Sequence, residues 1–154
     1  MTQALRWLEA AGAAYEPVVY SYEEHGGTNH AAESLGLDEH ACIKTIVLET
    51  DAKKPLIVLM HGDREISTKQ VARIVGAKTV SPCSPETANR HTGYLVGGTS
   101  PFGTRKPLPV YVEESILELP EIAINGGRRG LLVRIAPELL ISKLKAVPVS
   151  AAQN

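Results

Sequence analysis

The chain has little cysteine, no excess of charge of either sign and no long hydrophobic run. Sixteen basic and 17 acidic side chains give a formal net charge of −1, which excludes a protein that coats nucleic acid through bulk electrostatics. No apolar run approaches the roughly 18 residues of a transmembrane helix, and the amino terminus lacks a basic segment followed by an apolar one. We therefore expect a cytoplasmic protein with no DNA partner and no membrane partner.

The two cysteines, Cys42 and Cys83, lie far apart and match no metal-ligand spacing. This favours a reducing compartment, with thiols that are buried or have no chemical role, and a disulfide between them is the alternative. The five histidines form no HExxH motif and have no cysteine or carboxylate at helical ligand spacing. We expect neither a metal nor another cofactor.

Length and composition favour one domain over residues 1–154, because 44% apolar residues are enough to fill one continuous core. Capping residues and glycine stops predict helices at 2–12, 30–35, 67–76, 84–91 and 137–144, with a helical turn at 38–42. Runs of β-branched and apolar residues predict strands at 15–22, 44–50, 55–60, 108–113, 121–125 and 131–135.

Strands and helices alternate without a strict βαβ repeat, so the predicted fold class is α+β (mixed α/β). We expect a mixed, partly barrel-like sheet with helices packed outside it. The strands 44–50 and 55–60 are almost continuously apolar, so they should form a central hairpin. The tail 147–154 is expected to be frayed.

Residues 92–103, named here the glycine loop, place glycines and a proline behind a short apolar segment. Glycine lets a ligand approach the main-chain amides without meeting a Cβ. The N–H groups of Gly97 and Gly98 are therefore candidate donors to a carbonyl oxygen, and such donors lower barriers by roughly 3 kcal/mol each in other enzymes. Arg105 and Lys106 follow at once and favour an anionic or carbonyl-bearing ligand. A glycine-rich hairpin without a ligand is the equal alternative.

Lys44 begins a buried strand, where an ammonium must reach solvent or a partner. It is a candidate site residue, with a snorkelling strand-end lysine as the alternative. The segment 126–130 offers free amides and two guanidinium groups to a phosphate, with a solvated hairpin tip as the alternative. Tyr20 and Tyr22 share one face of a regular strand, and that face is either core or pocket.

No nucleophile is indicated by the sequence. Ser100 lies among glycines but not in a G-x-S-x-G motif, and neither cysteine stands beside an obvious base. The residues therefore suggest a site that positions a substrate rather than one that attacks it.

Five motifs together resemble the YbaK/EbsC family, and the match spans nearly the whole chain. They are IKTIV at 43–47, GAK at 76–78, TGYLVGGTSPFG at 92–103, KPLP at 106–109 and GGRRGL at 126–131. The family comprises free-standing relatives of the editing domain inserted in bacterial prolyl-tRNA synthetase, and its members hydrolyse mischarged aminoacyl-tRNA. The glycine loop ending in Ser-Pro-x-Gly is the most specific of these motifs.

The resemblance implies that Lys44 is the family's functional lysine at the tRNA 3′ end. It also implies that the segment 97–101 is the family's Gly-x-x-x-Pro substrate loop, with Gly97 and Gly98 at the carbonyl. Further substrate contacts are implied for Thr45, Thr99, Ser100, Pro101, Gly127 and Arg128. The family's pocket tyrosine falls on Tyr20 in an ungapped alignment and on Tyr22 by the local sequence YEEH, so both are candidates.

One position departs from the family pattern, because Leu132 stands where YbaK-like members can carry an active-site aspartate. The resemblance implies a trans-editing hydrolase for Cys-tRNA(Pro), cleaved with help from the substrate's own thiol. The missing carboxylate leaves Ala-tRNA(Pro) or another misacylated tRNA as an alternative substrate. The expected partners are the aminoacyl-tRNA 3′ end and prolyl-tRNA synthetase, and a non-catalytic aminoacyl- or nucleotide-binding module is the competing class.

Overall fold

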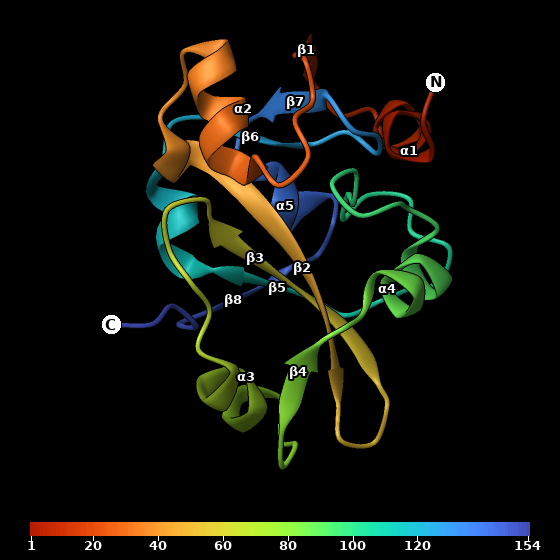
Figure 1. Ribbon diagram of the computed structural model, residues 1–154, viewed down its shortest axis with the longest axis vertical. Coiled ribbons are helices and arrows are strands. Elements are labelled where there is room, and N and C mark those ends of the chain that lie inside the picture. Colours follow the sequence, from red (N-terminus) through yellow and green to blue (C-terminus); the bar gives the residue numbers. More distant parts are fainter.

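The computed structural model describes all residues from 1 to 154 and has one eight-stranded mixed sheet flanked by helices (Figure 1). The sheet order is β1-β7-β6-β2-β3-β5-β8, and β4 pairs with β2 beside this path. The strands are β1 (Glu16–Val19), β2 (Cys42–Thr50), β3 (Pro55–His61), β4 (Val80–Pro82), β5 (Val110–Glu113), β6 (Ile122–Asn125), β7 (Leu131–Ile135) and β8 (Val147–Val149). The helices are α1 (Gln3–Ala10), α2 (Gly27–Leu35), α3 (Thr68–Val75), α4 (Pro85–Thr92) and α5 (Leu139–Ser142), with short 3-10 helices η1 (Glu39–Ala41) and η2 (Glu114–Glu118). The predicted mixed sheet with helices outside is confirmed.

The β2–β3 hairpin forms the centre of the sheet, as its continuous apolar sequence predicts. The two strands are antiparallel from the pair Ile43–His61 to the pair Glu49–Pro55. Alternate residues of β2 pack on opposite faces of the sheet, so Val47 joins the main core cluster and Leu48 joins a second one.

The other edge of β2 is shared by two short strands that do not meet. β6 runs parallel to β2 opposite Cys42 and Ile43, and β4 runs antiparallel opposite the residues from Leu48 to Thr50. No strand residue faces 44–47 on this edge. This interruption of the sheet, named here the β2 gap, positions the candidate site.

Most predicted helix ends agree with the structure. Ser67 caps α3 by accepting a hydrogen bond from the Gln70 amide, and Gly76 ends the helix with a positive φ of 74°. Ser84 caps α4, which begins at Pro85 as predicted. The final helix is shorter than expected, at Leu139–Ser142, and β4 and η2 were not predicted because three to five residues give no periodic signal.

The carboxyl-terminal tail is ordered, so the expectation of a frayed segment 147–154 was wrong. β8 pairs in parallel with β5, and the fully buried Ala151 packs in the second core cluster. Two main-chain amides, of Ala151 and Ala152, donate to the buried carboxylate of Glu113 at 2.7 and 3.1 Å. A short segment without hydrophobic periodicity is thus held by strand pairing and by a carboxylate that lies 38 residues earlier in sequence than Ala151.

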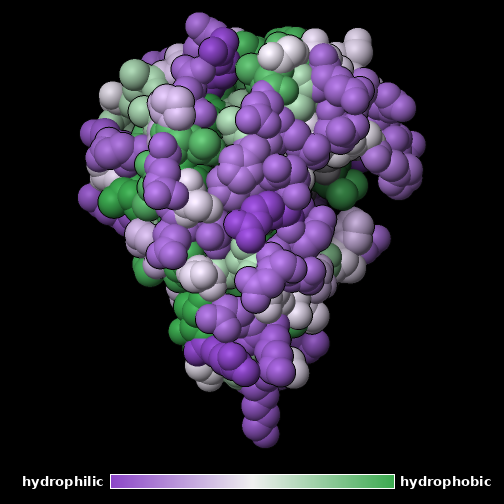
Figure 2. All heavy atoms as spheres, turned by 90° about the vertical axis from the view of Figure 1, so that its left-hand side faces the viewer, coloured by the Kyte–Doolittle hydropathy of each residue, from purple (hydrophilic) through white to green (hydrophobic).

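The helices cover both faces of the sheet (Figure 1). α1 and the glycine loop pack on the main core cluster, α3 on the second and α2 on a small third cluster. In the view of Figure 2 the surface is mostly hydrophilic, with apolar atoms in small separate groups. None of the helices combines the length and the apolar character that crossing a bilayer requires.

Candidate active site

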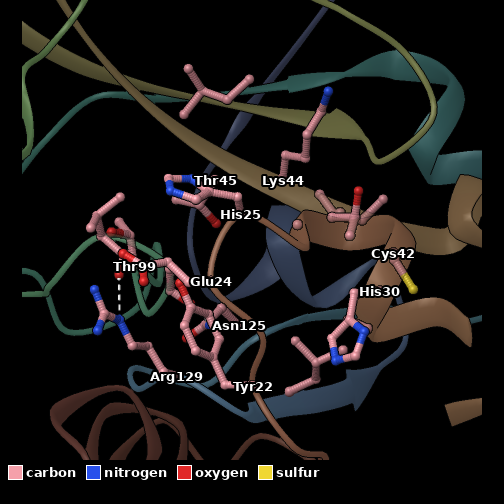
Figure 3. Close-up of a pocket in the computed structure, with 18 of the residues that line it drawn as sticks. Tyr22, Glu24, His25, His30, Cys42, Lys44, Thr45, Thr99, Asn125 and Arg129 are labelled. Atoms are coloured by element: carbon pink, nitrogen blue, oxygen red, sulfur yellow. Dashed lines mark hydrogen bonds between the residues drawn. The ribbon is translucent and has the colours of Figure 1, made fainter. Parts of the chain in front are cut away.

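A pocket of about 520 Å³ lies at the β2 gap. Its walls come from β2, from the segment 20–25 and the start of α2, from the end of β4 and the start of α4, from the glycine loop, and from β6, β7 and the turn between them (Figure 3). Of the candidate residues, the structure brings six to this pocket: Tyr20, Tyr22, Lys44, Thr45, Gly97 and Thr99. It places five outside the lining: Gly98, Ser100, Pro101, Gly127 and Arg128.

Lys44 contributes its side chain to the pocket wall, but its ammonium is turned away from Tyr22 and Arg129 (Figure 3). The Nζ atom lies 3.3 Å from Oε1 of Glu65, whose side chain is 75% exposed. An exposed ion pair of this kind contributes roughly 0–1 kcal/mol, so the ammonium can leave Glu65 for an anionic ligand at little cost.

Thr45 has the one buried side-chain polar atom in the chain that lacks a hydrogen-bond partner, its Oγ1. Leaving a buried polar group unpaired costs about 1–3 kcal/mol, so such groups point to a partner supplied from outside the chain. The hydroxyl belongs to a residue that lines the pocket beside the β2 gap.

Some polar groups of the glycine loop are hydrogen-bonded within the loop, and others have no partner in the protein. The Gly98 amide donates to the Leu95 carbonyl at 2.9 Å, and the fully buried Ser100 accepts a hydrogen bond from the Phe102 amide. Gly97 has a φ of +85° and its N–H has no acceptor within the protein. Of the two predicted amide donors, Gly98 is therefore engaged in the loop itself and only Gly97 is available.

Arg129, which the sequence did not single out from its neighbour, clamps the glycine loop over the pocket. Its Nε donates to the Val96 carbonyl at 2.8 Å, and its guanidinium lies 5.1 Å from the centroid of the Tyr22 ring (Figure 3). Asn125 adds a hydrogen bond from Nδ2 to the Gly97 carbonyl at 3.2 Å. Arg128, the predicted residue, is exposed and does not line the pocket.

Both candidate tyrosines line the pocket, although β1 ends before either of them. Tyr22 lies under Arg129, and a Cβ on Gly97 would collide with its hydroxyl. Tyr20 packs with the third core cluster, and burial raises the pKa of its phenol, which keeps it a neutral hydrogen-bonding group. Tyr22 therefore belongs to the loop side of the pocket and Tyr20 to its apolar side.

The apolar side of the pocket contains Cys42, Ala123 and Leu132. Both cysteines are free and line the pocket, and burial raises the pKa of each thiol to about 11. At neutral pH both thiols stay protonated, so neither acts as a nucleophile. Leu132 supplies no carboxylate, and the carboxylates in the lining, those of Glu23 and Glu24, come from the segment that precedes α2.

The remaining cluster of potential ligands lies outside the pocket lining. His40, His61 and Asp63 have ligand atoms within 4.8 Å of one another. However, the two imidazoles stack 3.7 Å apart at an interplanar angle of 8°, and His40 Nδ1 is 2.8 Å from Asp63 Oδ1. Stacked rings direct their lone pairs in parallel rather than toward one point, so the arrangement suits packing better than a metal.

The sequence model of the aminoacyl-tRNA editing domain matches residues 23–142. EbsC of Enterococcus faecalis, provisionally named a Cys-tRNA(Pro)/Cys-tRNA(Cys) deacylase, is 30% identical over 142 residues, covering 92% of this chain and 87% of that protein. The chain belongs to the aminoacyl-tRNA editing domain family.

Two further relatives place it within this family. Proline–tRNA ligase of Limosilactobacillus fermentum is 26% identical over 106 residues, which cover 66% of this chain and 18% of the ligase. A crystal structure of a provisionally assigned trans-editing enzyme for prolyl-tRNA synthetase superposes with a TM-score of 0.88 at 25% identity, covering 100% of this chain and 99% of that one. The resemblance to the YbaK/EbsC family and the enzyme class, an aminoacyl-tRNA deacylase, are thereby confirmed.

Proposed function

We propose that the protein is a trans-editing hydrolase that removes the amino acid from mischarged aminoacyl-tRNA, with Cys-tRNA(Pro) as its principal substrate. The observation that carries the proposal is the pocket at the β2 gap, whose lining includes Lys44, Gly97 with an amide that has no acceptor in the protein, and Thr45 with an unpaired hydroxyl. These groups can hold an ester and its ribose, and none of them is a nucleophile. The proposed place of action is the cytoplasm, where aminoacyl-tRNA is made and used.

The positive groups at the pocket hold the RNA end. Lys44 exchanges its exposed partner Glu65 for a phosphate or a ribose hydroxyl at the tRNA 3′ end. Arg129 uses only Nε to hold the glycine loop, so its terminal NH2 groups remain available for a neighbouring phosphate. With a net charge of −1 the protein has little general attraction for RNA, so binding is weak and salt-sensitive.

The reaction needs positioning more than attack. The Gly97 N–H, without an acceptor of its own, orients the ester carbonyl and stabilises the charge that develops on its oxygen. The cysteinyl thiol then attacks its own carbonyl carbon, the ribose oxygen leaves with the proton, and water opens the cyclic thioester. The enzyme's own thiols, with pKa values of about 11, do not compete for this step.

The lining supports a small uncharged amino acid. Ile43 and Val47, which lie on the same face of β2 as Thr45, line the pocket with apolar side chains, and these favour an uncharged amino acid side chain over a charged one. Ala-tRNA(Pro) is the alternative substrate, for which a positioned water or a ribose hydroxyl replaces the thiol. Prolyl-tRNA synthetase is the proposed partner, because tethering to it would offset weak RNA binding.

A deacylation panel tests the function. The purified protein is incubated with Cys-tRNA(Pro), Ala-tRNA(Pro) and correctly charged Pro-tRNA(Pro), and release of the labelled amino acid is followed. The proposal expects fast release of cysteine, slower release of alanine and none of proline. Release from Ala-tRNA(Pro) alone would transfer the assignment to alanine, and release from none would leave a non-catalytic binding module.

A further inference from the structure

We propose that the aminoacyl group binds in the β2 gap as a one-residue antiparallel strand, exchanging two hydrogen bonds with the backbone of Thr45. This inference rests on the proposed function and adds to it the way in which the enzyme recognises the main-chain part of the amino acid. It assigns recognition to a backbone segment rather than to a side chain.

The hydrogen bonds around β2 show which of its backbone groups face the gap. The Val47 carbonyl accepts from the Cys83 amide at 3.0 Å, and the Ile57 amide donates to the Pro109 carbonyl at 2.9 Å. Val47 and Ile57 lie opposite each other in the β2–β3 hairpin, but their backbone groups bond to other segments. They therefore form a non-hydrogen-bonded pair. Because this pattern repeats every two residues, the N–H and C=O of Thr45 also point away from β3 and into the gap.

No strand of the chain pairs with β2 beside Thr45 on the edge that faces the gap. The parallel pairing with β6 ends at Ile43, and the antiparallel pairing with β4 begins at Leu48. Thr45 lies midway between them and lines the pocket. Beyond Ile43 the next occupied backbone group on this edge is the Val47 carbonyl, which Cys83 binds, so Thr45 is the one residue between them whose N–H and C=O both face the gap.

The side chain of Thr45 gives an independent sign of a ligand at the same residue. The buried Oγ1 of Thr45 has no hydrogen-bond partner. Buried main-chain and side-chain polar groups are almost always paired in folded proteins. A residue with an unpaired hydroxyl whose backbone also faces a pocket is expected to gain partners when that pocket is filled.

An aminoacyl ester carries the donor and the acceptor that the C=O and N–H of Thr45 require. In a hydrogen-bonded antiparallel pair, one residue exchanges both an N–H and a C=O bond with one residue opposite. An aminoacyl ester has an α-ammonium donor and a carbonyl acceptor on either side of a single Cα. The ammonium can donate to the Thr45 carbonyl while the carbonyl oxygen of the ester accepts from the Thr45 N–H.

The pairing complements the glycine loop. A carbonyl oxygen has two lone pairs, so the ester oxygen can accept from the Thr45 N–H and from the Gly97 N–H at once. The side chain of an L-amino acid paired in this way lies on the same face of the sheet as the Thr45 side chain. Recognition of the backbone is then independent of which amino acid is esterified.

The test uses acceptor-stem RNA of tRNA(Pro) whose terminal ribose carries a 3′-amino group acylated with alanine, which the enzyme cannot release as an ester. The controls are the same RNA without an acyl group and the same RNA acylated with propionate, which lacks the ammonium. The readouts are the dissociation constant and the amide NMR signal and hydrogen-exchange rate of Thr45 in the full chain.

We expect the alanyl RNA to slow Thr45 amide exchange about tenfold and to bind about tenfold more tightly than the propionyl RNA, as one charge-assisted hydrogen bond provides. The unacylated RNA should leave the Thr45 amide unchanged. Thr45→Val is the matched variant, because it removes the hydroxyl and keeps the backbone and the branched shape. The amide response should persist in it.

Several outcomes overturn the pairing. They are an unchanged Thr45 amide with the alanyl RNA bound, an equal response to the unacylated RNA, and a response that disappears in Thr45→Val. The deacylation panel separates this failure from failure of the proposed function. Release of amino acid with a silent Thr45 amide removes the pairing alone, and release from none of the charged tRNAs removes the proposed function.

Discussion

Two polar regions of this protein treat their hydrogen-bonding groups in opposite ways. In the pocket, Gly97 keeps an amide without an acceptor and Thr45 a hydroxyl without a partner. In the region between β3 and the carboxyl-terminal tail, named here the tail network, the polar groups are paired with one another. The difference separates groups that stabilise the fold from groups that are available to a ligand.

The tail network shows what full pairing looks like. His61 Nδ1 lies 2.8 Å from the His40 carbonyl, which can only accept, so Nδ1 carries the proton and Nε2 accepts from the Ser115 hydroxyl at 2.7 Å. Glu113 accepts from the amides of Ala151 and Ala152. Although this network contains a serine hydrogen-bonded to a histidine, His61 is fully buried and lines no pocket at the β2 gap. We interpret the network as a structural feature that stabilises the position of the tail.

The largest expected effect is at Gly97. In Gly97→Ala the new Cβ would collide with the Tyr22 hydroxyl, and a side chain at a φ of +85° is strained, so the loop must move and the amide donor is lost. We expect kcat/KM for deacylation to fall by about 100-fold or more.

Gly76→Ala is the matched control for Gly97. Its φ is +74°, but a Cβ there meets no atom within 4 Å and the residue ends α3 away from the pocket. It should lose a similar amount of stability and keep its activity. Equal losses of kcat/KM in the two variants would show that backbone strain, not the loop donor, explains the effect.

The next largest effect is at Lys44. In Lys44→Ala the tRNA end loses a charge-assisted contact of about 2 kcal/mol, so kcat/KM should fall by roughly 30-fold. The melting temperature should stay the same, because the partner Glu65 is exposed. Full activity in Lys44→Ala would remove this residue from the site.

In the tail network the effect should fall on stability instead. Glu113→Gln removes the charge that the amides of Ala151 and Ala152 bind, and we expect unfolding in urea to show a loss of about 1.5 kcal/mol. The kcat of the folded variant should match that of the unchanged protein. A loss of kcat without a loss of stability in Glu113→Gln would instead show that the tail network contributes to catalysis.

The same network should make stability depend on pH. Burial lowers the pKa of His61 below its usual 6.5. As the pH falls through 6.5, the unfolded chain therefore binds a proton at His61 at a higher pH than the folded protein does. The free energy of unfolding should be constant above this range and fall below it, by at most about 1.4 kcal/mol per pH unit. Urea titrations at several pH values would measure this, and a flat profile between pH values of about 5.5 and 7.5 would contradict it.

The smallest effect is expected at Glu65, which competes with the substrate for Lys44. Glu65→Gln frees the ammonium, and because exposed ion pairs contribute little, KM should fall by only about twofold. The gain should be greatest at low salt, where RNA binding and ion pairing are both strongest. A rise in KM would instead show that the carboxylate contributes to the site.

The sequence by itself determined the elements whose signals are local. Ser67 and Gly76 bound α3 because capping is read within a few residues, and the apolar runs on either side of a short turn fixed the central hairpin. The order of five motifs was also enough to identify the family, and with it the region of Lys44 and the glycine loop.

Only the tertiary structure decided which neighbour in each pair faces the pocket, Arg129 rather than Arg128 and Gly97 rather than Gly98. It also revealed the tail as a strand and the β2 gap, in which Thr45 has no strand opposite it. These features depend on contacts between segments far apart in sequence. Periodicity describes how residues repeat along one segment, whereas an unpaired backbone group is defined by which other segment stops short of it.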